Sequence, residues 1–216
     1  MTELDPATLV VAADHLLSTT RSVRRRLDLE RPVDRQVVLD CIRLSMQAPT
    51  ASNGQDWRWV VVTDPDLRSA IAEHYRQVGA DYLARAARTG EDPQTRRVYE
   101  SAAELAGILD RVPVLAIPCI RRRFDGQPNV VAASAYGSVL PAAWSFLLAL
   151  RSRGLGSCWT TLHLLREREV AELLGIPDDV TQVALFPVAH TIGDDFRPAA
   201  RPPAEDITYW NAWGPE

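Results

Sequence analysis

A run of 21 residues without a charged side chain, Val130 to Leu150, limits what this chain can fold into more than any other feature. Its length is about that of a helix that crosses a bilayer. However, small residues and Pro141 dilute its larger apolar side chains, and a membrane span is usually more hydrophobic. We therefore predict a central helix of a soluble domain, buried on all sides.

The rest of the chain fits one soluble domain. With 216 residues, it is long enough to bury a core without metals or disulfides. Arginines number 24 and acidic residues 28, so the net charge is -4. This balance argues against nucleic acid or an anionic membrane as the main partner.

Every basic residue is an arginine, and the sequence contains no lysine. A Walker A loop, a protein kinase site and a pyridoxal phosphate enzyme each need a lysine, so all three are excluded. An anionic ligand must instead be held by arginine side chains, hydroxyl groups or backbone N–H groups.

Cysteines and histidines are scattered, and no CxxC pair occurs. We therefore expect no metal site, and the odd number of three cysteines suits a reducing compartment.

The chain opens with acidic residues where a signal peptide would be basic, which predicts a cytoplasmic protein. Thiol catalysis by Cys158 with His163 is a further possibility, but five residues along a strand-like segment give no reason for contact.

Periodicity predicts alternating helices and strands. Residues 89–98 are charged and poorly periodic, so a mobile segment is expected there. The aromatic and arginine residues of 75–99 either cover a cleft or form an exposed amphipathic helix. Pro113 suggests an edge strand or a strand start. Helices are expected at 6–19, 34–48, 65–88, 100–110, 130–153 and 167–174, and strands at 57–63, 112–119, 157–161 and 180–189.

Polar clusters lie between these elements, at 20–24, at 49–55 and at Arg197 with Arg201. Arginine and serine at nearby positions after a helix suit a phosphate clamp, because a guanidinium forms paired hydrogen bonds with an anion. A solvated basic turn would show the same pattern, and the cluster alone does not separate the two.

Five short motifs follow one another along the chain. They are Thr20-Arg-Ser-Val-Arg24, Ala48-Pro-Thr-Ala-Ser-Asn-Gly-Gln-Asp-Trp57, Gly154-Leu-Gly-Ser-Cys-Trp159, Leu174-Gly-Ile-Pro177, and Arg201-Pro-Pro-Ala-Glu205 with Trp210. In this order they resemble the motifs of the FMN-dependent nitroreductase family, and the resemblance extends over about residues 16 to 213. Two positions depart from the family pattern: Thr20 stands where its first arginine is usual, and Asp56 replaces a proline.

The resemblance implies an α+β fold with a central, mainly antiparallel sheet flanked by helices, in an intertwined homodimer with two FMN sites at its interface. Residues 1–216 would form a single nitroreductase-like domain, and about 193–216 a C-terminal extension that wraps the partner subunit. The uncharged helix at 130–150 would then form the dimer core.

The same resemblance implies the cofactor-binding residues. The residues that would hold the FMN phosphate and ribityl chain are Arg21, Ser22, Arg24 and Arg201. Those that would reach the flavin from the partner subunit are Pro49, Thr50, Ala51, Asn53 and Gln55. Those that would present backbone groups to the flavin N5 edge are Thr160, Thr161 and Leu162.

The activity implied is a ping-pong reaction in which NAD(P)H reduces FMN and leaves, and a nitroaromatic or quinone then takes the hydride. No side chain is assigned a catalytic role, because the protein supplies orientation and an N–H dipole. Alternatives are a flavin-dependent oxidase or dehydrogenase of a specialised small molecule, a flavin-cleaving enzyme, and a flavin-storage protein with little turnover.

Overall fold

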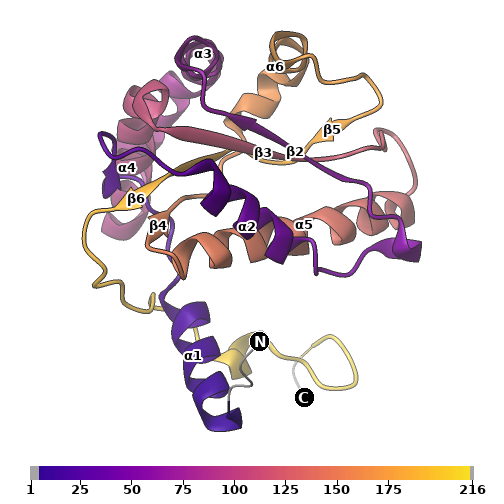
Figure 1. The fold of residues 1–216 in the computed structure, drawn as a ribbon. Coiled ribbons are helices and arrows are strands. Elements are labelled where there is room, and N and C mark those ends of the chain that lie inside the picture. Colours follow the sequence, from indigo (N-terminus) through magenta and orange to yellow (C-terminus); the bar gives the residue numbers. More distant parts are fainter. Residues whose placement is uncertain (1–4, 215–216) are drawn as a thin grey trace. The chain divides into compact units, whose positions relative to one another are not determined.

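The computed structural model describes residues 5–214, which divide into two compact units. One unit runs from Arg21 to Asp194 and contains the sheet. The other combines the chain up to Thr20 with the chain from Asp195 onward. The arrangement of the two units relative to each other is not determined (Figure 1).

The larger unit is built on a six-stranded sheet in which every strand pair is antiparallel. Four strands follow one another across the sheet in the order β1-β6-β3-β2, while β4 pairs with β6 and β5 pairs with β3. The α+β fold with a mainly antiparallel sheet is therefore confirmed. The strands are β1 Leu27–Asp28, β2 Trp57–Val62, β3 Val114–Ile120, β4 Leu155–Gly156, β5 Thr181–Gln182 and β6 Phe186–Thr191.

Helices cover both faces of this sheet (Figure 1). Helices α2 and α5 lie on one face, and α3 and α6 lie on the other, with α4 packed against α3. The helices are α2 Arg35–Ser45, α3 Pro65–Thr89, α4 Pro93–Ile108, α5 Asn129–Arg151 and α6 Glu167–Leu174. Short 3-10 helices are η1 Ala51–Asn53, η2 Leu109–Arg111 and η3 Leu162–Arg166.

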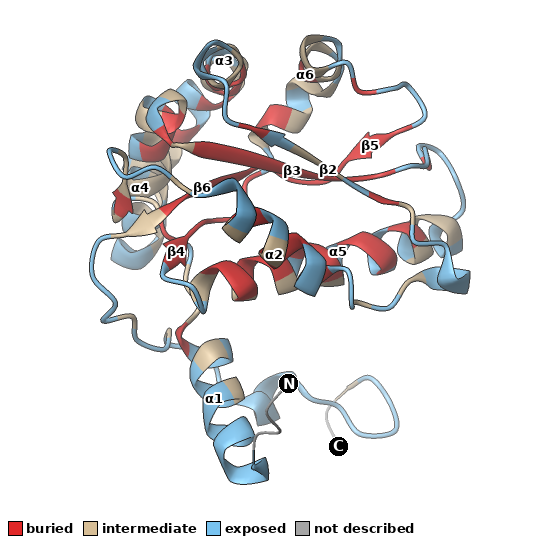
Figure 2. Cartoon of the chain, in the orientation of Figure 1, coloured by how far each residue is buried: buried red, intermediate tan, exposed pale blue. Residues whose placement is uncertain are grey.

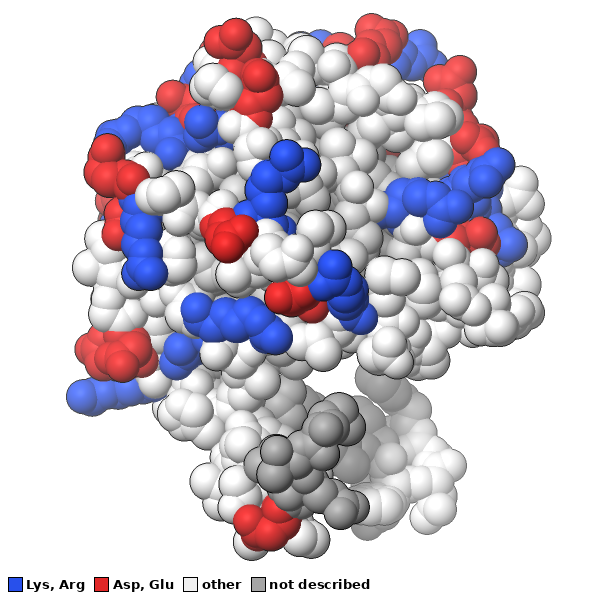
Figure 3. Space-filling model, in the orientation of Figure 1, with Lys and Arg blue, Asp and Glu red and all other residues white. Residues whose placement is uncertain are grey.

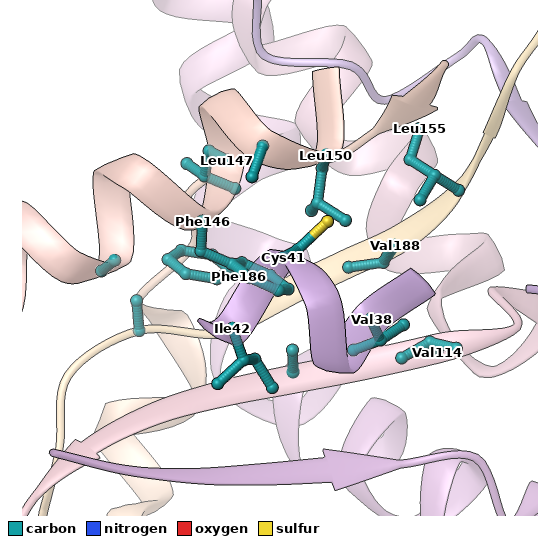
Figure 4. Close-up of a cluster of buried hydrophobic side chains, with 14 residues drawn as sticks. Val38, Cys41, Ile42, Val114, Phe146, Leu147, Leu150, Leu155, Phe186 and Val188 are labelled. Carbon is teal, nitrogen blue, oxygen red and sulfur yellow. The ribbon is translucent and has the colours of Figure 1, made fainter. Parts of the chain in front are cut away.

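One hydrophobic core lies between the sheet and the layer of α2 and α5 (Figure 4). At its centre, the rings of Phe146 from α5 and Phe186 from β6 stack with centroids 6.1 Å apart. Cys41 of α2 is buried beside them, and β3 is buried along its whole length (Figure 2). Burial of this apolar surface joins α5 firmly to the sheet.

Helix α5 contains the uncharged run and passes the length and composition test for a membrane span. Nine of its residues are buried within the domain, which identifies it as a core helix. It is not buried on all sides, contrary to our expectation. An exposed apolar stripe, which we call the α5 stripe, remains at Ala133, Tyr136, Gly137, Leu140 and Trp144.

Several predicted boundaries were wrong. Residues 89–98 are not an irregular segment, because α4 begins at Pro93. The segment 157–161 is not a strand; β4 ends at Gly156, and only Thr160 forms an isolated bridge, to Leu185. The predicted strand at 180–189 is divided into β5 and β6. Pro113 does precede a strand, but β3 lies inside the sheet and not at its edge.

The smaller unit contains α1 Pro6–Thr19 and the 3-10 helix η4 Ala204–Ile207. The carboxylate of Asp5 caps α1 by accepting hydrogen bonds from two backbone N–H groups. Much of this unit's apolar surface is exposed, including Trp210 at 72% and Trp213 at 90%. An apolar surface this open is typical of a segment that packs against another chain.

Candidate functional site

The turn at residues 21–24 is held against the end of β4. The Val23 N–H donates to the Ser157 carbonyl at 2.8 Å. A side chain on Gly156 would place its Cβ only 2.7 Å from a methyl carbon of Thr191 and 3.0 Å from Val23. Glycine at this position therefore allows the turn and the strand to approach closely.

The arginines at the end of this turn form ordinary structural contacts. Arg25 is ion-paired with Glu104 of α4, and its Nη2 donates to that carboxylate at 2.7 Å. Arg26 donates from Nε to the carbonyl of Ile192 at 2.7 Å. These two residues join the turn to the rest of the fold.

By contrast, no carboxylate of the described chain pairs with Arg21 or Arg24. Arg24 donates to the Ser101 hydroxyl at 3.3 Å and contacts the Cys158 thiol. Arg21 is half-buried, and neighbouring Ser22 is exposed. Two cations and a hydroxyl group without an acidic partner are suited to hydrogen-bond an anion.

The side chain of Arg24 points into a buried polar cluster with Tyr75, Cys158 and Thr160. Burial raises the pKa of Tyr75 to about 12, although a hydrogen bond with Thr160 lowers it. Burial likewise raises the pKa of Cys158 to about 11, opposed by Arg24. The phenol and the thiol therefore stay protonated near neutral pH.

His163 does not form a catalytic pair with Cys158. It is fully buried, and neither ring nitrogen has a hydrogen-bond partner among residues 5–214. Burial lowers its pKa to about 4, so the ring is neutral at pH 7. A neutral histidine with no bond to a protonated thiol cannot activate that thiol.

Residues 160–162 combine a fixed backbone with free N–H donors. Thr160 is fixed to Leu185: its N–H and its hydroxyl donate to the Leu185 carbonyl at 3.1 and 3.0 Å, and the Leu185 N–H donates back at 2.9 Å. The next two N–H groups, of Thr161 and Leu162, have no acceptor in the described part of the chain. Adjacent unpaired donors on a fixed backbone are suited to hydrogen-bond a ligand.

The loop at 49–55 is tightly folded and locally strained. Ser52, Asn53 and Gln55 have φ values of 52°, 54° and 50°, which side chains rarely adopt. The Gln55 amide donates to the Asn53 side-chain oxygen at 2.8 Å. Strained backbone of this kind concentrates at functional sites.

A serine of α5 fixes this loop. The Ala51 N–H donates to the Ser138 hydroxyl at 2.9 Å, and the Trp57 indole N–H donates to the Ser138 carbonyl at 2.8 Å. Ser138 lies near the middle of α5, whereas β4 follows its C-terminal end at Arg151. Ser138 and Arg151 are 13 positions apart in the helix, which is a rise of about 20 Å.

The structure therefore brings only part of the predicted site together. Arg21, Ser22, Arg24 and residues 160–162 lie at one place, while the loop that contains Pro49, Thr50, Ala51, Asn53 and Gln55 lies farther along α5 (Figure 1). Arg201 belongs to the smaller unit, where its guanidinium donates to the Ala200 carbonyl.

Three contact residues were missed by sequence reasoning: Tyr75, Ser101 and Ser138. Each supports a predicted site residue from a helix far away in sequence. A serine inside an apolar helix is a signal that could have drawn attention to Ser138. Tyr75 and Ser101 carry no such signal, because their roles depend on tertiary packing.

The surface shows no dominant sign of charge on the face that Figure 3 displays. Arginines and acidic residues alternate over it. An interspersed surface gives little long-range attraction for a polyanion.

An antiparallel sheet between two helix layers defines an α+β protein, and its turn at 21–24 contains two arginines without a carboxylate partner in the described chain. The profile of the nitroreductase family matches residues 17–190. The chain belongs to this family and is an oxidoreductase.

Two curated relatives and one solved structure illustrate the similarity. A Thermus thermophilus NADH dehydrogenase is 29% identical over 88% of this chain and 91% of its own length. A Rhodospirillum rubrum 5,6-dimethylbenzimidazole synthase is 30% identical over 79% and 78%. The fold resembles an iodotyrosine deiodinase bound to FMN and 3-iodo-L-tyrosine, with a TM-score of 0.69 and 22% identity over 92% and 98%.

Proposed function

We propose that this chain is an FMN-dependent oxidoreductase that passes hydride from NAD(P)H to nitroaromatic or quinone acceptors. One observation carries the proposal: the turn with Arg21 and Arg24, which have no carboxylate partner in the described chain, is bonded to Ser157, just before the segment with two free N–H groups. That donor set matches the two polar ends of FMN, its phosphate and its flavin ring. The family membership and the FMN-bound deiodinase of the same fold support the same cofactor.

In this proposal, Arg21, Ser22 and Arg24 hold the phosphate and ribityl chain, together with Arg201. The backbone of 160–162 faces the N5 edge of the ring, where the N–H groups of Thr161 and Leu162 donate. Bound FMN supplies the hydride acceptor and donor between the two substrates. The chain's own task is to orient the ring and to leave one face open to each substrate in turn.

The titratable side chains nearest the site take no part in proton transfer. Tyr75 and Cys158 stay protonated and His163 stays neutral near pH 7, because burial opposes the charged form of each. The proposal therefore assigns no catalytic role to a side chain. The free N–H groups provide the electrostatic contribution instead.

A homodimer would complete the site. We propose that the loop at 49–55 reaches the flavin of the partner subunit, because Ser138, which fixes this loop, lies about 20 Å along α5 from the helix end that leads into β4. The uncharged α5 stripe and the exposed tryptophans of the C-terminal segment supply apolar surface for such an interface. The enzyme would act in the cytoplasm.

The first test is the visible absorption spectrum of the purified protein, before and after anaerobic addition of NADH or NADPH. A yellow protein that bleaches within seconds supports the proposal, and the better reductant identifies the preferred nucleotide. Adding a nitroaromatic or a quinone should then restore the colour.

Other outcomes separate the alternatives. A yellow protein that neither nucleotide bleaches would favour an oxidase or a storage protein. Loss of flavin absorbance with formation of a benzimidazole under oxygen would favour the reaction for which the Rhodospirillum rubrum relative is named. A colourless protein that does not take up added FMN would overturn the proposal.

A further inference from the structure

A glycine inside α3 faces the segment with the free N–H groups. Gly79 is buried in the middle of this helix, where glycine destabilises the helix relative to alanine. A Cβ on Gly79 would lie 2.8 Å from Cδ1 of Leu162. The space that any other side chain needs is therefore filled by Leu162.

The same face of α3 contacts the segment a second time. Tyr75 lies one helical turn before Gly79, and its hydroxyl lies beside the Thr160 side chain. Thr160 is itself fixed in place, because its hydroxyl donates to the Leu185 carbonyl at 3.0 Å. Two contacts one turn apart fix both ends of residues 160–162.

We propose that Gly79 is a positioning residue, which sets the depth of Leu162 and thereby the placement of the N–H donors of Thr161 and Leu162. The inference rests on the proposed FMN site. It adds that α3, which contributes no residue to the predicted cofactor contacts, determines the hydrogen bonds available to the flavin ring.

The substitution Gly79→Ala tests this directly. The atom that it would crowd is the flexible end of a leucine, so the strain can be relieved by moving Leu162. Alanine also favours the helix. We therefore expect a melting temperature within about 3 °C of the wild type.

The flavin should report the displacement of Leu162. We expect Gly79→Ala to weaken FMN binding about tenfold, measured by quenching of flavin fluorescence on titration of the apoprotein. The ratio of the affinities for oxidised and reduced FMN should change about fivefold, which moves the two-electron midpoint potential by about 20 mV. Neither measurement depends on turnover.

Two further variants identify the cause. Gly107→Ala makes the same change inside α4, where nothing lies within 4 Å of the added carbon, and should leave affinity and potential unchanged. Adding Gly79→Ala to a Leu162→Ala chain should have no further effect, since the crowded methyl group is gone. If Gly79→Ala did not fold, Tyr75→Phe, which removes only the hydroxyl beside Thr160, should move the potential in its place.

The outcomes distinguish this inference from the proposed function. A wild-type chain that binds no FMN would overturn both. The wild-type chain could instead bind FMN while Gly79→Ala shows the same affinity and potential as the wild type. That result would overturn only the role of Gly79. Where Tyr75→Phe replaces Gly79→Ala, unchanged affinity and potential in Tyr75→Phe would have the same meaning. That role would also be overturned if Gly107→Ala changed the flavin equally, or if Gly79→Ala acted as strongly without the Leu162 side chain.

Discussion

Neighbouring arginines of the 21–26 turn differ in their partners, and this difference separates structural from functional roles. Arg25 is paired with Glu104, while Arg24 has only a hydroxyl and a thiol. We predict that Arg24→Ala weakens FMN binding by about 1.5–3 kcal/mol, the usual scale for loss of a charged hydrogen-bond partner. Arg25→Ala is the matched control and should bind FMN like the wild type. Equal affinities in both variants, measured by fluorescence titration, would refute the phosphate role of Arg24.

His163 makes the stability of the protein depend on pH. Its pKa is about 4 in the folded chain and about 6.5 when unfolded. The stability from the neutral ring is complete above pH 6.5 and is lost as the pH falls toward 4. Between pH 7.5 and pH 5, the wild type should lose about 2 kcal/mol more free energy of unfolding than His163→Leu. Urea unfolding followed by circular dichroism, at one protein concentration, measures this difference; parallel losses would contradict it.

At the scale of elements, the contact between the 49–55 loop and α5 can be tested through Ser138. Ser138→Ala removes the acceptor of the Ala51 N–H, which should cost about 1 kcal/mol of stability and loosen the loop. FMN affinity should fall as well, because residues of this loop are proposed to contact the flavin. Ser134→Ala, one turn earlier, leaves intact the carbonyl to which Ser138 donates and serves as the control. A Ser138→Ala chain with normal affinity would show that the loop is not part of the site.

Elements with a strong local signal were predictable from the sequence. Helices α1, α2, α3, α5 and α6 and strand β2 lie close to their predicted ranges. The start of α4 was missed although Asp92-Pro93 is a helix-start signal: the Asp92 carboxylate accepts from two N–H groups of the first turn. The charges of 89–98 concealed this signal because they lack a regular apolar spacing.

The candidate site was predictable only through motifs, and its supporting contacts were not predictable at all. The residues 21–24 and 160–162 were identified from the family pattern, and the structure brings them together. The fit of Leu162 into the gap at Gly79 depends on how α3 crosses η3, 83 residues away in sequence. Spacing along the chain holds no information about such a distant contact.

At the scale of the whole molecule, the α5 stripe makes the assembly testable. Light scattering should give a mass twice that of the 24.0-kDa chain. Trp144 is 42% exposed on this stripe, and Trp144→Glu should shift the protein toward monomer and release FMN, because a charge in an apolar interface is costly. Val98→Glu makes a similar change on exposed α4 and should stay dimeric. A Trp144→Glu protein that remains dimeric would show that α5 is not the interface.

The separation of the arginine turn from the 49–55 loop along α5 also has a genetic consequence. If the two halves of each site come from different chains, then two defective alleles, one with Arg24→Ala and one with Ser138→Ala, should complement each other. A mixed dimer would carry one doubly damaged site and one site made of two undamaged halves. Were both halves drawn from the same chain, no mixture of these alleles could regenerate a wild-type site.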